Sequence, residues 1–90
     1  MGNNLKCFQG DGEPITLVFD CVSLGTHEIR TYDGVRLKHV LRQLSKRINV
    51  SDSQIDQVLY LYTVLDKNRK IREFGIPSGG VLSIKFKKDY

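Results

Sequence analysis

Two cysteines and two histidines are the side chains of this sequence best suited to chemistry, and their spacing assembles no reactive site. His27 and His39 stand singly, with no serine or cysteine nucleophile spaced to work with them and no paired carboxylates in an apolar setting. No glycine cluster is followed by Lys-Ser or Lys-Thr, the pattern of a phosphate-binding loop. We therefore expect no catalytic residue, no cofactor-binding residue and no enzymatic activity.

The two cysteines predict neither a metal site nor a disulfide framework. Cys7 and Cys21 have no third or fourth Cys or His ligand at metal spacing, and two cysteines are too few for a disulfide scaffold. Cys21 continues the alternating apolar set Ile15, Leu17 and Phe19, so we expect a small buried side chain there. Cys7 lies in a polar segment, where an exposed thiol is expected. Both cysteines fit a reducing, cytoplasmic compartment.

The basic charge of the chain is concentrated in its second half. The 90 residues hold 14 Lys and Arg and 10 Asp and Glu, for a net charge of +4. Residues 1–35 hold two basic and five acidic residues (net −3), and residues 36–90 hold twelve basic and five acidic residues (net +7). A basic half of this kind attracts nucleic acid, anionic lipid or an acidic partner protein. No apolar run is long enough to cross a bilayer, and the polar start is not a signal-peptide pattern.

The sequence predicts one folded domain, which positions these residues. Glycines, a proline and polar residues dominate residues 1–13, which we interpret as a flexible leader before a single domain over residues 14–88. Alternation of apolar and polar residues predicts strands over 15–22 and 27–32, joined closely enough to form an antiparallel hairpin.

A helix is predicted after this hairpin. Apolar residues recur at helical spacing and form a single stripe, while basic residues occupy the other faces, with no acid among residues 36–47. The stripe consists of Leu37, Val40, Leu41, Leu44 and Ile48.

Two further strands complete the pattern. Residues 58–65 are apolar on both alternations, which is typical of a strand inside a sheet or of one with an exposed binding face. A short segment anchored by Ile71 and Phe74 leads to a closing strand over 81–87. One helix against a mixed sheet of four to five strands is an α+β fold.

The order of these elements and the closing stretch resemble the ubiquitin-like β-grasp fold. The matching stretch is KIREFGIPSGGVLSI over residues 70–84, and the resemblance covers residues 14–87. Within that superfamily the sequence is similar to the small bacterial YukD/EsaB type of type VII secretion systems, through ITLVFD at 15–20, the apolar helix 35–44 and the same closing stretch. The chain departs from that type in its longer leader and its basic, aromatic end, KKDY.

The resemblance implies a protein-interaction module that is not conjugated to other proteins. Conjugating members end in a flexible diglycine after the last strand, whereas Gly79-Gly80 precedes the final strand here and is expected to form a turn with positive φ. The positions that align with the apolar recognition patch of ubiquitin are near Tyr60, Ser83 and Lys85. The implied role is that of a non-covalent accessory component on the cytosolic side of a type VII secretion system. The alternative is a ubiquitin-like or Ras-binding-type domain of a larger eukaryotic regulatory protein.

Two surfaces are candidate protein-binding sites under this resemblance. In a β-grasp sheet the final strand is central, so outward residues of the first, third and last strands share one face, where tyrosines beside lysines favour protein contacts. The predicted sheet-face site is Val18, Tyr60, Tyr62, Ser83, Lys85 and Lys87. The alternative site is the basic helix with one strand residue, as in Ras-binding domains: Arg30, Arg36, Lys38 and Arg42. No aromatic residue is interleaved with these charges, so a protein partner is expected before nucleic acid.

Overall fold

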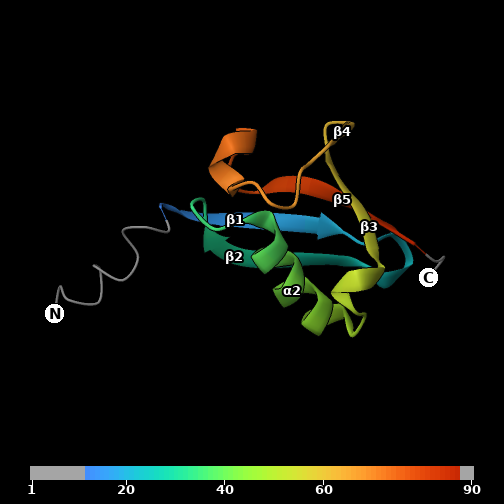
Figure 1. The fold of residues 1–90 in the computed structure, drawn as a ribbon. Coiled ribbons are helices and arrows are strands. Elements are labelled where there is room, and N and C mark those ends of the chain that lie inside the picture. The colour runs from blue at the N-terminus through green and yellow to red at the C-terminus, as the bar shows by residue number, and fades with distance from the viewer. Residues whose placement is uncertain (1–11, 88–90) are drawn as a thin grey trace, which may run out of the picture.

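The protein forms a five-stranded mixed sheet with one α-helix packed across it (Figure 1). The computed structural model describes residues 12–87, so Cys7 and the predicted leader before residue 12 lie outside the described residues. The strands are β1 (Pro14–Asp20), β2 (Thr26–Tyr32), β3 (Ile55–Tyr60), β4 (Thr63–Val64) and β5 (Gly80–Phe86), and the helix is α2 (Leu37–Ile48). Short 3-10 helices lie at Val22–Leu24, Asp52–Gln54 and Ile71–Phe74.

The strand order β2-β1-β5-β3-β4 places the closing strand at the centre of the sheet, as predicted. β1 and β2 form the expected antiparallel hairpin, β5 runs parallel to β1, and β3 runs antiparallel to β5. Because successive side chains of a strand point to opposite faces, each strand sends one set of residues toward α2 and the other to the opposite face. We call that opposite face, which α2 does not cover, the outer face.

The core lies between α2 and the inner face of the sheet. Four residues of the predicted helical stripe, Leu37, Val40, Leu41 and Leu44, are buried there, and Ile48 packs partly buried against them. The helix ends where Asn49 adopts a left-handed conformation and its backbone N–H donates to the Ser45 carbonyl. The predicted helix is thus confirmed in position and in its buried face. Within residues 12–87, no helix is long and apolar enough to cross a membrane.

The predicted strand over 58–65 is wrong, because the chain reverses direction inside it. β3 begins at Ile55 and ends at Tyr60, a two-residue turn follows at Leu61 and Tyr62, and β4 pairs back with Leu59 opposite Val64. Leucine and tyrosine carry no turn signal, so the apolar run concealed the hairpin. The neighbouring anchor segment behaves as expected: Ile71 is fully buried and Phe74 is partly buried against the core.

Gly79-Gly80 leads into the central strand. Gly79 has a φ of +87°, which confirms the predicted turn. Gly80 opens β5, and a Cβ at that position would lie 2.6 Å from Cγ2 of Ile76 and 3.0 Å from the Pro77 carbonyl oxygen. The first glycine therefore makes the turn, and the second allows close packing.

Cys21 is the small buried side chain that the alternation predicted. It is fully buried, and its thiol lies 3.9 Å from the Phe19 carbonyl oxygen, to which it donates. Burial raises the pKa of this thiol to about 11, because the thiolate would lose its hydration, and the negative charge of Asp20 adds to the effect. Cys21 is therefore a protonated core residue at neutral pH.

Candidate protein-binding surfaces

The outer face is built from alternate residues of neighbouring strands. On β5, Val81, Ser83 and Lys85 are exposed, and they alternate with the buried Leu82 and Ile84. The parallel register sets Val18 of β1 beside Val81. The antiparallel register sets Leu59 beside Ser83 and Gln57 beside Lys85.

Exposed hydrophobic side chains gather at one end of this face. Of the five large hydrophobic side chains exposed within residues 12–87, only Val22 lies elsewhere, in the turn between β1 and β2. The other four are Val81 (53% exposed), Val64 (53%), Leu61 (73%) and Tyr62 (99%). We call these four residues and Leu59 the apolar tip.

The apolar tip encloses an open hollow of about 380 Å³ between the β3–β4 turn and the start of β5. Its lining residues are Leu59, Leu61, Tyr62, Val81 and Ser83. An exposed apolar group of this kind, rimmed by polar residues, is typical of a protein-docking surface. The hollow gives a partner's side chain somewhere to pack.

The turn that carries this tip is strained. Leu61 and Tyr62 both have positive φ, 51° and 67°, as the two central residues of a tight type I′ hairpin turn require. Asn-Gly is the favoured pair there, because a left-handed conformation costs roughly 1–2 kcal/mol for a residue with a larger side chain. The chain therefore places two large side chains where they are strained and, at the same time, exposed to water. Strain of this kind collects at functional sites.

The structure brings some of the predicted sheet-face residues together around this hollow. Tyr62 and Ser83 line it, and Val18 lies beside Val81 at its edge. Lys85 lies farther along β5 on the same face, and Lys87 follows the end of that strand; both are exposed.

Tyr60 does not belong to the outer face, and the prediction that it does is wrong. Tyr60 shares its side of β3 with the buried Val58, because the two are two residues apart in a strand. Its ring is partly buried against the core, and its Cε1 would lie 3.6 Å from a Cβ at Gly80. The β3 residue beside Ser83 on the outer face is Leu59.

The sequence-based site missed Leu59, Leu61, Val64 and Val81. A signal for Val81 was present, since it has the same alternation as Ser83 and Lys85. Leu61 and Val64 were missed because an uninterrupted strand over residues 58–65 assigns side chains at and beyond the turn to the wrong face. Leu59 precedes the turn and was missed because both alternations of this segment are apolar, so alternation does not mark which one faces the core.

The predicted basic-helix residues fall into separate groups. Arg30 lies on β2 opposite Thr16, on the outer face. Arg42, on α2, has its Nε 3.7 Å from the carboxylate of Asp52. Arg36 and Lys38 lie at the start of α2, where the segment over residues 66–73 packs against them.

The two histidines have different surroundings. Nε2 of His27 lies 2.8 Å from the Leu24 carbonyl oxygen, which ties the imidazole to the β1–β2 turn. His39 is exposed on α2. In the part of the chain that the structure describes, no group of three or more His, Cys, Asp or Glu residues is placed to hold a metal ion.

Comparison with known proteins supports the architecture alone. No family model and no curated protein matches the sequence. Among solved structures, a protein designed de novo on the basis of ubiquitin is similar, with a TM-score of 0.74 and 16% sequence identity, over 86% of this chain and 93% of that chain. This likeness does not bear on the YukD/EsaB-type resemblance. Together with the topology above, it shows that the chain has a ubiquitin-like β-grasp fold.

Proposed function

We propose that this protein is a non-covalent protein-interaction module whose partner docks on the outer face, centred on the apolar tip. The observation that carries the proposal is the gathering of four exposed hydrophobic side chains at one end of the sheet, two of them on a strained turn. Burying such side chains stabilises a complex by roughly 25 cal/mol per Å² of apolar surface. Aromatic side chains such as Tyr62 are enriched among the residues that dominate binding energy.

The proposed module is neither conjugated nor catalytic. The Gly79-Gly80 pair is used inside the fold, at the turn into the central strand and against Ile76, and is therefore not a free conjugation tail. We propose that the protein acts by binding alone.

Site-specific photocrosslinking in cells tests the docking surface. A photoreactive amino acid at position 62 is expected to capture a discrete partner, because that side chain is 99% exposed at the tip. The matched control carries it at Lys46, an exposed position on α2. Capture should disappear when Leu59→Asp is added to the first variant. Equal capture from both positions, or capture from position 46 alone, would refute docking at the tip.

We further propose that the docking partner belongs to a type VII secretion machine and that the protein works on the cytosolic side of that machine. The support is the likeness of residues 15–20, 35–44 and 70–84 to YukD/EsaB-type proteins. The test is direct binding of the purified protein to the cytosolic components of such a machine from the same genome. Absence of that machine, with crosslinking at position 62 intact, would favour the alternative, a domain of a larger eukaryotic regulatory protein.

A further inference from the structure

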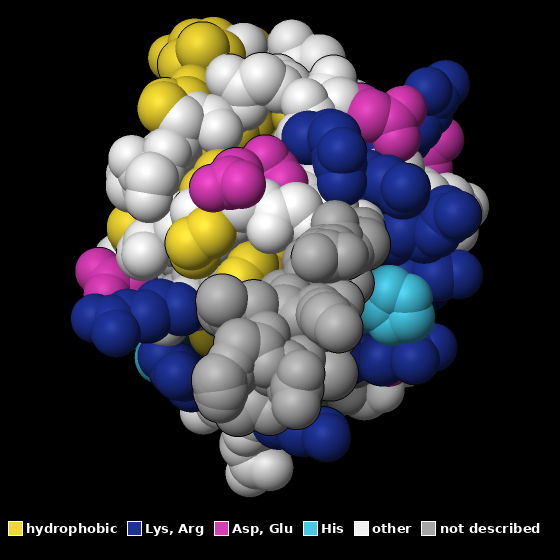
Figure 2. Space-filling view, turned by 90° about the vertical axis from the view of Figure 1, so that its left-hand side faces the viewer, with side chains coloured by type: hydrophobic (Ala, Val, Ile, Leu, Met, Phe, Trp, Pro, Cys, Tyr) yellow, Lys and Arg dark blue, Asp and Glu magenta, His cyan; other side chains and the backbone are white. Residues whose placement is uncertain are grey.

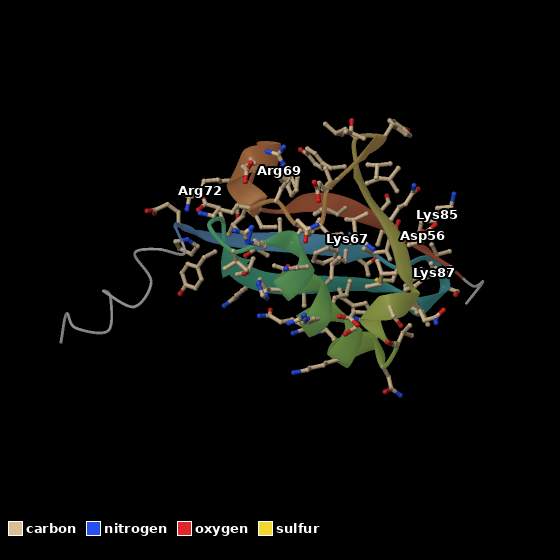
Figure 3. All side chains as sticks on the ribbon, viewed as in Figure 1. Asp56, Lys67, Arg69, Arg72, Lys85 and Lys87 are labelled. Atoms are coloured by element: carbon tan, nitrogen blue, oxygen red, sulfur yellow. The ribbon has the colours of Figure 1, made fainter. Side chains whose placement is uncertain are left out.

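The start of α2 and the segment over residues 66–73 form a strongly basic surface away from the apolar tip. Figure 2 shows lysine and arginine side chains gathered along one side of the molecule, while exposed hydrophobic side chains lie at its opposite upper edge. Figure 3 places Arg69 and Arg72 at the opposite end of the molecule from Lys85 and Lys87, with Lys67 between the two groups. We call the following residues the basic surface: Arg36, Lys38, Lys67, Lys70 and Arg72.

Backbone hydrogen bonds hold these two segments together, although about thirty residues of chain separate them. The N–H groups of Leu37 and Lys38 donate to the carbonyls of Arg69 (3.0 Å) and Lys67 (2.9 Å). Arg36 also forms an isolated antiparallel bridge with Lys70. These bonds satisfy donors at the start of α2, which are unpaired within a helix. They also hold the backbones that carry the five cations side by side. Within this surface the Lys67 Nζ donates to the Ile55 carbonyl (2.7 Å) and the Arg36 Nη1 to the Asn68 carbonyl (3.0 Å), so both side chains are held by neutral acceptors.

The acids of this region do not neutralise the basic surface. Asp66 and Glu73 both face Arg69, whose Nη1 lies 2.8 Å from the Glu73 carboxylate and whose Nε lies 4.0 Å from that of Asp66. The hydrogen bond from Arg69 lowers the pKa of Glu73, so this carboxylate is ionised and already engaged at neutral pH. Residues 36–38 and 66–73 together contain six cations and two acids, and this net +4 equals the net charge of the whole chain.

We propose that the basic surface is a second binding site, which takes an acidic polypeptide segment. Complementary charge favours such a partner and speeds its association. Residues 36–38 and 66–73 contain no aromatic residue; Phe74 lies just beyond them and is partly buried against the core.

Two other polyanions fit these observations less well. Single-stranded nucleic acid is bound chiefly by aromatic side chains on which bases stack, and segments 36–38 and 66–73 offer none. Stable attachment to an anionic membrane needs apolar insertion as well as basic charge, and the exposed hydrophobic residues lie in the β1–β2 turn and at the apolar tip. An extended segment rich in Asp and Glu needs only the charge that the basic surface supplies.

The test measures binding of a short peptide of alternating Asp and Glu residues to the intact protein by fluorescence anisotropy, with a Gln/Asn peptide of equal length as the neutral probe. The patch variant is Lys38→Glu/Arg72→Glu. The matched control, Arg30→Glu/Lys85→Glu, changes the net charge equally but on the outer face. We expect the patch variant to weaken acidic-peptide binding by roughly tenfold or more and the control by less than about threefold.

Equal loss in both variants would mean that net charge alone attracts the peptide, and would overturn the proposal. Failure of the unmodified protein to prefer the acidic peptide over the neutral one would do the same. A DNA duplex or anionic lipid vesicle bound more tightly than the peptide, and lost in the patch variant, would reassign the surface. If the patch variant fails to fold, Lys38→Gln/Arg72→Gln makes the same comparison with half the charge change. Crosslinking from position 62 tests the apolar tip separately, so either surface can fail alone.

Discussion

The apolar tip and the basic surface offer a partner different kinds of contact: apolar side chains at the tip and positive charge at the basic surface. The tip centres on one strained turn, whose side chains Leu61 and Tyr62 are uncharged and mostly exposed, and the segment from Leu59 to Leu65 contains no ionisable acid or base other than tyrosine. The basic surface joins two segments that are distant in sequence, whose backbones are hydrogen-bonded to each other and whose side chains carry like charge. Each region carries an unfavourable term in the isolated protein that a partner would relieve. For the tip that term is strain and exposed apolar area, and for the basic surface it is like charge.

The contrast has a consequence for how the two surfaces should respond to change. Hydrophobic contacts depend on side-chain shape and area and are barely screened by salt, whereas contacts between exposed charges weaken as ionic strength rises. Substitutions that alter shape should therefore affect the tip, and substitutions that alter charge should affect the basic surface.

The largest expected difference is between separate alanine substitutions of two tyrosines that lie two residues apart. Tyr60→Ala should lower the free energy of unfolding by about 2–3 kcal/mol, because a ring packed against the core is lost. Tyr62→Ala should change it by less than about 0.5 kcal/mol, because that side chain is 99% exposed, yet it should weaken binding of the partner captured from position 62. Urea denaturation measures both values. Similar values for the two variants would contradict the assignment of Tyr60 to the core side of β3.

A second prediction separates strain from contact at the tip. Leu61→Asn/Tyr62→Gly should raise the free energy of unfolding by about 1–2 kcal/mol, because this pair adopts the left-handed turn readily. The same variant should lose partner binding, because both exposed hydrophobic side chains are gone. Leu61→Ser/Tyr62→Ser is the control, since it removes the contacts but keeps the strain and should lose binding without the gain in stability. If the Asn-Gly variant were no more stable than the original, the turn would not be strained.

Much of the fold could be predicted from the sequence because its patterns are local. The spacing from Leu37 to Ile48 specifies an amphipathic helix, and the alternation of Ile15, Leu17 and Phe19 specifies a strand with one buried face. The break between β3 and β4 could not be predicted in this way. Tertiary pairing imposes positive φ on Leu61 and Tyr62 against their own preference, so no local turn signal marks the place.

The candidate sites were less predictable because they depend on pairing between distant segments. Ser83 and Val18 lie on the outer face, as alternation predicts. On β3 that face holds Leu59 and not Tyr60, because both alternations are apolar and neither marks the inner face. Arg36 and Lys38 were recognised as exposed charges on a helix. Their contact with residues 66–73 depends on backbone hydrogen bonds between segments far apart in sequence, and sequence periodicity does not predict such bonds.

Salt offers a third way to separate the two surfaces. Raising the salt concentration from about 50 to about 200 mM should weaken acidic-peptide binding to the basic surface by roughly tenfold, because the Debye length falls below about 8 Å and attraction between exposed charges is screened. Crosslinking from position 62, carried out in a cell lysate at the same salt concentrations, should change by less than about twofold, because the apolar tip carries no charge. Parallel titrations of the two signals make the measurement. A steep fall in both would show that charge also governs docking at the tip.

The smallest expected effect concerns the repulsion within the basic surface itself. Lys38 lies in the first turn of α2, near the positive end of the helix dipole and beside Lys67, whereas Lys46 lies in the last turn, near the negative end. Lys38→Gln should therefore raise the free energy of unfolding at low salt by about 0.3–0.5 kcal/mol, and Lys46→Gln should lower it by a similar amount. Arg72 lies outside α2, so Arg72→Gln reports repulsion among the cations without a contribution from the α2 dipole. This variant should also raise the free energy of unfolding. All three differences should shrink near 1 M salt, where exposed charges are screened within about 3 Å. A loss of stability in both Lys38→Gln and Arg72→Gln at low salt would mean that these cations are already paired within the protein, and the basic surface would then have no excess charge to offer a partner.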